Sequence, residues 1–179
     1  MPATLVWMDL EMTGLDPETD TIIEIATIIT DDHLEVVEEG PVFAIAQPES
    51  VLAAMDDWNT RTHTESGLVD RIRKEGVTMA DAEAATLSFV QRHVAERAAP
   101  LCGNTIWQDR RFLVRYMAQL EAWLHYRNID VSTIKELAQR WRPEVASGHR
   151  KRNAHTALSD IRESIDELKY YRANFFSMS

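Results

Sequence analysis

The first third of the chain carries apolar stretches that have the pattern of β-strands. Residues 4–12 are mostly apolar, which predicts a strand covered on both faces. The β-branched stretch 21–30 predicts a second strand, and a third is expected over 34–46, before Pro48. Three consecutive strands with short connections favour an antiparallel meander.

Beyond Pro48 the apolar spacing changes from that of strands to that of helices. In one segment, apolar residues recur at intervals of three and four, and Asp109 lies on the same stripe as Phe112. Strands followed by alternating helices and strands predict an α/β domain with a mixed sheet. We expect helices over 50–57, 65–75, 78–97, 107–124 and 155–172, and a further helix that Ser132 caps and that runs to about Trp141. Short strands are expected at 100–104 and 128–132.

The composition is that of a globular protein with one core. A chain of 179 residues is most simply one domain, so we expect a single domain over residues 1–179. Hydrophobic residues make up 45% of the chain and charged residues 27%, and no apolar run reaches the length of a membrane span, which disfavours disordered and membrane-spanning classes. Cys102 is the single cysteine, so no internal disulfide can form. With an N-terminus unlike a signal peptide, this predicts a cytoplasmic location.

The net charge of −10 is unusual for a protein that grips long nucleic acid, because such binding draws on a broad basic surface. Solubility alone explains an acidic surface. The alternative is that bound divalent cations offset part of the excess, with a short polyanion delivered to the metal.

Two carboxylates end the first predicted strand. Asp9 and Glu11 are two residues apart, so their side chains point to the same face of an extended strand. Like charges held together raise each other's pKa or require a cation. For such a pair on its own a solvated turn is the alternative, and Asp109 could equally be an acid favoured by a helix dipole. Glu24, inside the second apolar strand, is expected to have a backbone donor or a basic neighbour, and we assign it no role.

Three motifs, in order along the chain, resemble those of the DEDDh exonucleases, a ribonuclease-H-like family: DLEMTGL at 9–15, NTIWQD at 104–109 and HTALSD at 155–160. The stretches at 55–68 and 125–137 resemble in particular a branch of that family that degrades very short RNA. The resemblance covers essentially the whole chain. It implies an α/β, ribonuclease-H-like fold, in which helices flank a mixed five-stranded sheet of three antiparallel and then two parallel strands.

The resemblance also implies two divalent cations, Mg²⁺ or Mn²⁺, in each active site. By this resemblance Asp9 bridges both ions, Glu11 and Asp160 complete the first site, and Asp109 holds the second ion largely through water. Hard divalent ions prefer carboxylate oxygen, and a pair of them can hold the attacking and leaving oxygens of a phosphodiester. His155 is implied as the general base. On an ideal helix it would diverge from Asp160 by about 140°, so we expect it on the loop or at the very start of the last helix.

Contacts with the substrate follow from the same resemblance. It implies an apolar wedge, aromatic stacking on the terminal bases, and a group that holds the 5′ phosphate of a very short strand. Without the resemblance, Trp58 and Tyr126 are equally ordinary core or interface aromatics. The basic stretch 149–152 is either a solvated loop or a segment that steers phosphates. The implied residues are Leu15, Trp58 and His63 for the bases, and Tyr126, Arg127, Ser132 and Lys135 for the far end of the strand.

The function implied is a 3′-to-5′ exoribonuclease that hydrolyses very short RNA, especially dinucleotides, to nucleoside 5′-monophosphates. A homodimer is implied as well, in which Tyr126 contributes to the partner's site. One alternative is a broader exonuclease acting on longer strands, against which the acidic charge counts. The other is a non-catalytic nucleic-acid-binding module, against which the presence of all four acids and His155 counts.

Overall fold

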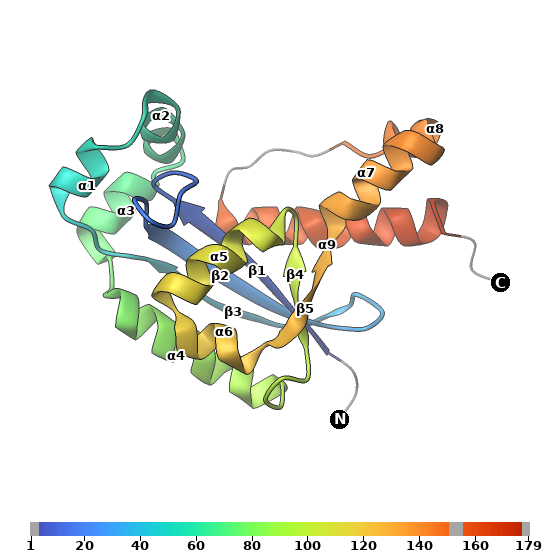
Figure 1. Ribbon diagram of the computed structural model, residues 1–179, viewed down its shortest axis with the longest axis horizontal. Coiled ribbons are helices and arrows are strands. Elements are labelled where there is room, and N and C mark those ends of the chain that lie inside the picture. The colour runs from blue at the N-terminus through green and yellow to red at the C-terminus, as the bar shows by residue number, and fades with distance from the viewer. Residues whose placement is uncertain (1–3, 151–155, 177–179) are drawn as a thin grey trace.

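A mixed five-stranded sheet forms the centre of the computed structural model, which describes residues 4–150 and 156–176 (Figure 1). The strands are β1 (Thr4–Met12), β2 (Ile22–Asp31), β3 (Val36–Ala44), β4 (Pro100–Gly103) and β5 (His125–Asp130). Their order is β3-β2-β1-β4-β5; β1, β2 and β3 pair antiparallel, whereas β1, β4 and β5 pair parallel. The expected fold, with three antiparallel and then two parallel strands, is confirmed.

Strand β1 is buried on both faces, as its near-continuous apolar sequence predicted. Successive side chains of a strand point to opposite faces. Val6 and Met8 accordingly belong to one core cluster and Trp7 to another. The cluster of Val6 includes residues of α4 (Met79–His93), α5 (Ile106–Tyr116) and α6 (Ala118–Trp123), and that of Trp7 includes residues of α7 (Val131–Trp141), α8 (Pro143–Ala146) and α9 (Ala157–Asn174).

A third apolar cluster packs two short helices, α1 (Glu49–Ala53) and α3 (Leu68–Glu75), against β2 and β3. Helix α2 (Asp57–Glu65) lies between them along the chain and contributes no residue to this cluster. The sequence pattern predicted helices over 50–57 and 65–75 and therefore missed α2. Its sequence has almost no apolar stripe, and the side chains it buries are the polar Asn59 and His63. The helix begins instead at a polar cap, the Asp56 carboxylate, which accepts a hydrogen bond from Asn59 N at 2.7 Å.

The helix expected over 107–124 is two helices, because the chain bends at Met117. This residue has φ −137° and ψ 56°, which no α-helix adopts, and its side chain is fully buried. The Glu83 carboxylate of α4 accepts hydrogen bonds from Gln119 N at 2.7 Å and Leu120 N at 3.1 Å. It thus satisfies the free amides at the start of α6. A tertiary contact therefore sets this boundary.

Two other helix starts differ from expectation. Asp130, not Ser132, caps α7, because its carboxylate accepts a hydrogen bond from Ser132 N at 2.9 Å. Helix α9 begins at Ala157, after Thr156, whose hydroxyl and backbone exchange hydrogen bonds with Ser159 in a capping box. Over the described residues, every helix is too short or too polar to cross a membrane.

Candidate active site

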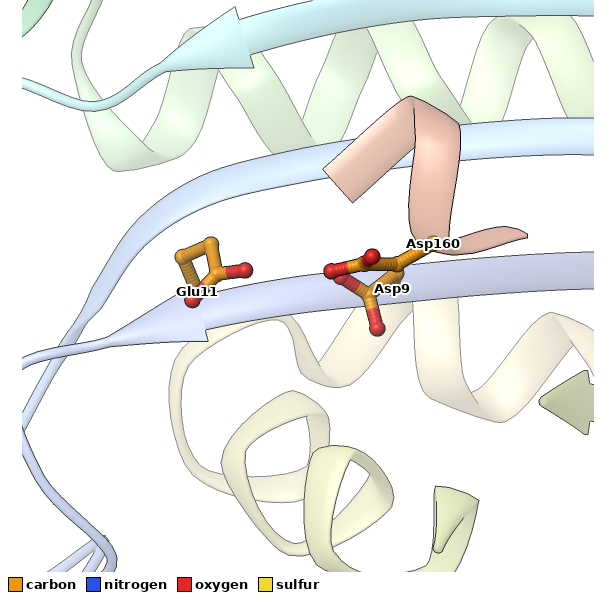
Figure 2. Close-up of side chains that lie close together, drawn as sticks. All are labelled: Asp9, Glu11 and Asp160. Atoms are coloured by element: carbon orange, nitrogen blue, oxygen red, sulfur yellow. The ribbon is translucent and has the colours of Figure 1, made fainter. Parts of the chain in front are cut away.

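Three carboxylates meet where β1 ends and α9 begins (Figure 2). Asp9 and Glu11 come from β1, and they lie on the same face of the sheet as Trp7, the face that α9 covers. Asp160 comes from the first turn of α9. One oxygen of each carboxylate lies within 4.8 Å of one oxygen of the other two. Residues that are about 150 positions apart in the chain are therefore placed at one point, as the motifs predicted.

A fourth acid reaches the same strand end from the other side of the sheet. Asp109 lies in the first turn of α5, is only 7% exposed, and shares a buried helix face with Phe112 and Leu113. Its Oδ2 accepts a hydrogen bond from Leu10 N at 3.4 Å. Since Leu10 lies between Asp9 and Glu11, the Asp109 carboxylate is adjacent to the three that cluster. The predicted burial of this acid on an apolar stripe is confirmed.

The protein environment disfavours ionisation of Asp9, Glu11 and Asp109. Burial is the main cause in each case. It raises the pKa of Asp9 well above its usual range, and the neighbouring charges of Asp109, Glu11 and Asp160 raise it further. Burial, with the charges of Asp160 and Glu24, raises the pKa of Glu11 to about 8. Burial likewise raises the pKa of Asp109 to about 8. Of the expected effect of the paired acids on each other's pKa, the effect of the Glu11 charge on Asp9 is confirmed.

A divalent cation fits this donor set. The cluster offers carboxylate oxygens, which Mg²⁺ and Mn²⁺ prefer, from three side chains that already converge. Among the described residues, no lysine or arginine forms an ion pair with Asp9 or Glu11. A bound cation would stabilise the ionised carboxylates that burial and mutual repulsion now disfavour.

A pocket of about 660 Å³ opens at the loop that follows β1, where Thr13 lies two residues after Glu11. Leu15 is 74% exposed and Trp58 is 59% exposed, and both line it. Trp58 is therefore not a core residue of this chain. The remaining lining residues are Thr13, Gly14, Asp20, Ala54, Asp56 and Asn59.

Hydrogen bonds fix the loop that carries Leu15. The Asp20 carboxylate accepts from the Thr13 hydroxyl at 3.2 Å and from Asp16 N at 3.0 Å. A Cβ on Gly14 would collide with that carboxylate, so a larger residue here would displace the Asp20 side chain from these hydrogen bonds. Gln108, next to Asp109 in α5, donates from Nε2 to the Leu15 carbonyl. Sequence reasoning missed Asp20 and Gln108. The signal that could have identified them is their position, since Asp20 follows the first motif and Gln108 lies within the second.

His63 is buried next to Glu11. It was expected in the base pocket with Leu15 and Trp58, but it is not among the residues that line that pocket. Its side chain is 2% exposed, with Nε2 3.0 Å from the Met12 carbonyl oxygen and Nδ1 3.8 Å from Glu11 Oε2. Burial lowers its pKa, which favours the neutral imidazole. A neutral ring near Glu11 holds the end of β1 without supplying a positive charge.

The residues predicted to hold the far end of the strand lie on β5 and α7, and they do not line the pocket of Leu15 and Trp58. Tyr126 is 74% exposed; its ring stacks on His125 with centroids 4.5 Å apart, and the Arg127 guanidinium lies 5.3 Å from its centroid. Ser132 and Lys135 lie in the first two turns of α7. His155 and the predicted basic residues 151–152 lie outside the described residues.

The Asp130 side chain links these residues to the helix of Asp109. Its Oδ1 accepts hydrogen bonds from Ser132 N at 2.9 Å and from Thr105 N at 2.9 Å. Thr105 adopts a left-handed φ of 52° immediately before α5. The starts of α5 and α7 are therefore held by one carboxylate.

A family model described as "Exonuclease" matches residues 6–168. That span includes all four acids and the strands and helices that position them. Carboxylates that converge at the end of a central strand are what a metal-dependent nuclease of this class requires.

Proteins of similar sequence show to which group of exonucleases the chain belongs. The chain is 63% identical to an oligoribonuclease of Alkalilimnicola ehrlichii over 97% of this chain and 90% of that protein. It is 58% identical to an oligoribonuclease of Pseudomonas aeruginosa, over 99% and 98% of the two chains, and 59% identical to one of Acinetobacter baylyi, over 96% and 94%. The chain therefore belongs to the oligoribonucleases of the exonuclease family, which confirms the resemblance seen in its motifs.

Solved structures agree on the fold. Escherichia coli exonuclease I, in a zinc-bound complex with single-stranded DNA, superposes with a TM-score of 0.74 at 19% identity, over 97% of this chain and 41% of that one. Exonuclease I of Methylocaldum szegediense gives a TM-score of 0.71 at 20% identity, over 96% and 41%. The chain thus spans about two fifths of the length of these larger proteins, and the likeness is one of fold.

Proposed function

We propose that this protein is a metal-dependent 3′-to-5′ exoribonuclease that hydrolyses very short RNA, especially dinucleotides, to nucleoside 5′-monophosphates in the cytoplasm. The observation that carries the proposal is the convergence of Asp9, Glu11 and Asp160 within 4.8 Å, with a pocket lined by Leu15 and Trp58 at the loop that follows β1. The oligoribonuclease name of its relatives supports very short RNA as the substrate. Residues 1–179 act as one domain in this proposal.

Two divalent cations, Mg²⁺ or Mn²⁺, are the cofactors. Asp9, Glu11 and Asp160 hold one of them, and Asp9 with Asp109 holds the other. When bound, such ions polarise the phosphodiester and lower the pKa of the attacking water. The carboxylates themselves bring the ions to the end of β1 and fix where the scissile phosphate has to lie.

The imidazole of His155 accepts the proton of the attacking water. Its unperturbed pKa of about 6.5 suits a group that must take up and release a proton near neutral pH. In the sequence, His155 precedes Thr156, the cap residue of α9, by one position.

The 3′-terminal bases bind at the pocket beside the metal centre. Leu15 wedges between them and Trp58 stacks on one, contacts that recognise any base because each has a flat aromatic face. His63 supports this pocket through its contacts with Met12 and Glu11.

The far end of the substrate is closed by residues of β5 and α7. Arg127, Ser132 and Lys135 hold the terminal 5′ phosphate, for which a guanidinium, a hydroxyl and an ammonium are suitable donors. The protein is a homodimer, and Tyr126 stacks across the site of the partner subunit. The high exposure of Tyr126 in the single chain, 74%, supports an intermolecular role.

A length series of end-labelled RNA, from dinucleotides to strands several times longer, tests the reaction and the substrate together. We expect rapid hydrolysis of dinucleotides to 5′-monophosphates, slower hydrolysis of longer strands, and none in the presence of a chelator. Equal rates at all lengths would favour the broader exonuclease, and binding without cleavage would favour the non-catalytic module. Sedimentation of the same preparation measures whether the chain is a dimer.

A further inference from the structure

Glu24 is a buried carboxylate next to the proposed metal centre, yet the proposed function gives it no task. It lies on β2 directly across from Glu11 of β1, in an antiparallel pair. Directly opposed residues of such a pair point to the same face. The Glu24 side chain is 2% exposed, so its charge is withheld from water. A carboxylate in such a place must be paired and hydrogen-bonded.

Both oxygens of Glu24 have partners, and these come from two different helices. Oε2 forms an ion pair with Nη1 of Arg71 on α3. Oε1 accepts a hydrogen bond from Ala157 N, the first residue of α9, at 3.0 Å. The expectation of a basic neighbour or a backbone donor for Glu24 is met by one of each.

The hydrogen bond to Ala157 N matters because of what α9 carries. The first amides of a helix have no partner within the helix, and a negative charge there is favoured by the helix dipole. Asp160 lies three residues after Ala157, within the same turn. Glu24 therefore holds the turn of α9 that presents Asp160 to Asp9 and Glu11.

The ion pair with Arg71 explains how a buried carboxylate can hold the first turn of α9. Its Nε also donates a hydrogen bond to Glu75 Oε1 at 3.1 Å, and the Arg71 side chain is 36% exposed, so it remains in contact with water. The pairing offsets part of the negative charge of Glu24. A carboxylate without that partner would add a further unpaired charge to a cluster in which ionisation is already disfavoured by burial and by neighbouring acids.

We propose that Glu24, oriented by Arg71, is a positioning residue that anchors the first turn of α9 and so fixes Asp160 at the metal centre. This inference rests on the proposed function in one respect, that Asp160 is a metal ligand. The anchoring itself is independent of it. Partners that orient a metal ligand from outside typically change metal affinity by about 10- to 100-fold when they are removed.

Two readouts on one set of variants test the proposal. Hydrogen exchange of the Ala157 amide is measured in metal-free protein, and Mn²⁺ affinity is measured by calorimetry without RNA. In Glu24→Ala we expect the Ala157 amide to exchange at least about 10-fold faster and the Mn²⁺ dissociation constant to rise by about 10-fold. Glu24→Gln keeps an acceptor oxygen for Ala157 N, so both changes should be smaller. Arg73→Gln, which removes a positive charge from the same helix at an exposed pair with Glu49, should change neither.

The pattern separates anchoring from a simple effect of charge. If Glu24 acted only through its charge, Ala and Gln would weaken Mn²⁺ binding equally and leave Ala157 exchange unchanged, and this result would overturn the proposal. Arg71→Gln is the variant to use if Glu24→Ala does not fold, because Arg71 is partly exposed. We expect faster exchange at Ala157 and weaker Mn²⁺ binding in Arg71→Gln. Tighter binding with unchanged exchange would contradict the anchor.

A failure of the proposed function gives a different pattern. If the wild-type protein bound no Mn²⁺ while Glu24→Ala still accelerated exchange at Ala157, the metal centre would be wrong and the anchor would stand. If wild type bound Mn²⁺ and every Glu24 and Arg71 variant bound it equally, the metal centre would stand and the positioning role would be wrong.

Discussion

Glu11 and Glu24 are the same residue type, directly opposed on neighbouring strands, yet they have opposite environments. Glu24 is 2% exposed and has an arginine and a backbone amide as partners. Glu11 is 22% exposed, and its neighbours are Asp9, Asp160 and the neutral His63. The protein supplies a cation for one glutamate and surrounds the other with acids.

The difference indicates which carboxylate is structural and which is functional. A buried charge that its protein compensates can be explained by the fold alone. A cluster whose pKa values are raised by burial and by each other is maintained at a cost to stability, and such sites are typical of metal binding or catalysis. The environment of Glu11 therefore predicts a bound ligand, and the environment of Glu24 does not.

The largest effect on activity is expected from removing a charge from the acidic cluster. Asp9→Asn removes a charge that both proposed ions share, and several kcal/mol of electrostatic stabilisation of the transition state are lost. We expect dinucleotide hydrolysis to fall by at least about 10⁴-fold, measured as single-turnover rates with saturating Mn²⁺. Asp32→Asn, the same change in an exposed loop, is the control and should retain full activity. Substantial activity in Asp9→Asn would contradict the two-ion site.

The next effect tests the proton acceptor, separately from the metal ligands. His155→Ala should lower kcat by about 10²- to 10⁴-fold, the usual contribution of a general base. Mn²⁺ affinity and KM should change little, because the carboxylates remain. A parallel loss of metal affinity and rate would assign His155 a structural role in the start of α9 instead.

A smaller effect is expected in the neighbouring pocket. Trp58→Ala removes a base-stacking surface worth about 1–3 kcal/mol, so KM for dinucleotides should rise by roughly 5- to 150-fold while Mn²⁺ affinity stays the same. Trp141 is 66% exposed on α7 and stacks on Phe175, so Trp141→Ala is the matched control. Equal effects of the two substitutions on KM would argue against the pocket as the base site.

The smallest expected effect is on folding stability, and it allows Glu11 and Glu24 to be compared directly. The raised pKa of Glu11, from 4.5 to about 8, means that the folded metal-free protein holds this proton more tightly than the unfolded chain. The stability that Glu11 contributes is present below about pH 4.5 and is lost as the pH rises through about 8. Glu11→Gln stays neutral, so it should be more stable than wild type by at least about 1 kcal/mol at about pH 9, and this gain should be much smaller at about pH 5.

Glu24→Gln should change stability in the opposite direction. It loses the charge-assisted bond with Arg71 and should be less stable by about 1–3 kcal/mol at either pH. Urea unfolding of metal-free wild type and both variants at the two pH values measures these differences. Destabilisation of similar size by Glu11→Gln at about pH 9 would mean that Glu11 is compensated within the protein, which would remove the contrast between the two residues.

The strands and most of the acidic site could be predicted from local patterns. Continuous apolar residues defined β1 and β2, and the two-residue spacing of Asp9 and Glu11 placed them on one face. Asp109 was detectable because it interrupts an apolar helical stripe that proved to be buried. The family motifs added Asp160, which periodicity alone did not single out.

The features that were not predictable depend on contacts between distant parts of the chain. Glu24 bonds to residues 47 and 133 positions away, and no local pattern identifies such partners. The bend at Met117 depends on Glu83 of another helix. Helix α2 has no apolar stripe because it buries Asn59 and His63, and a period of hydrophobic residues cannot reveal a helix of that kind.

Diffraction from a crystal soaked in Mn²⁺, recorded at a wavelength where manganese scatters anomalously, tests the central claim most directly. We predict strong anomalous density between Asp9, Glu11 and Asp160, a second peak between Asp9 and Asp109, and none at Glu24, whose oxygens are held by Arg71 and Ala157. No density among the four acids, or density beside Glu24 instead, would contradict the account.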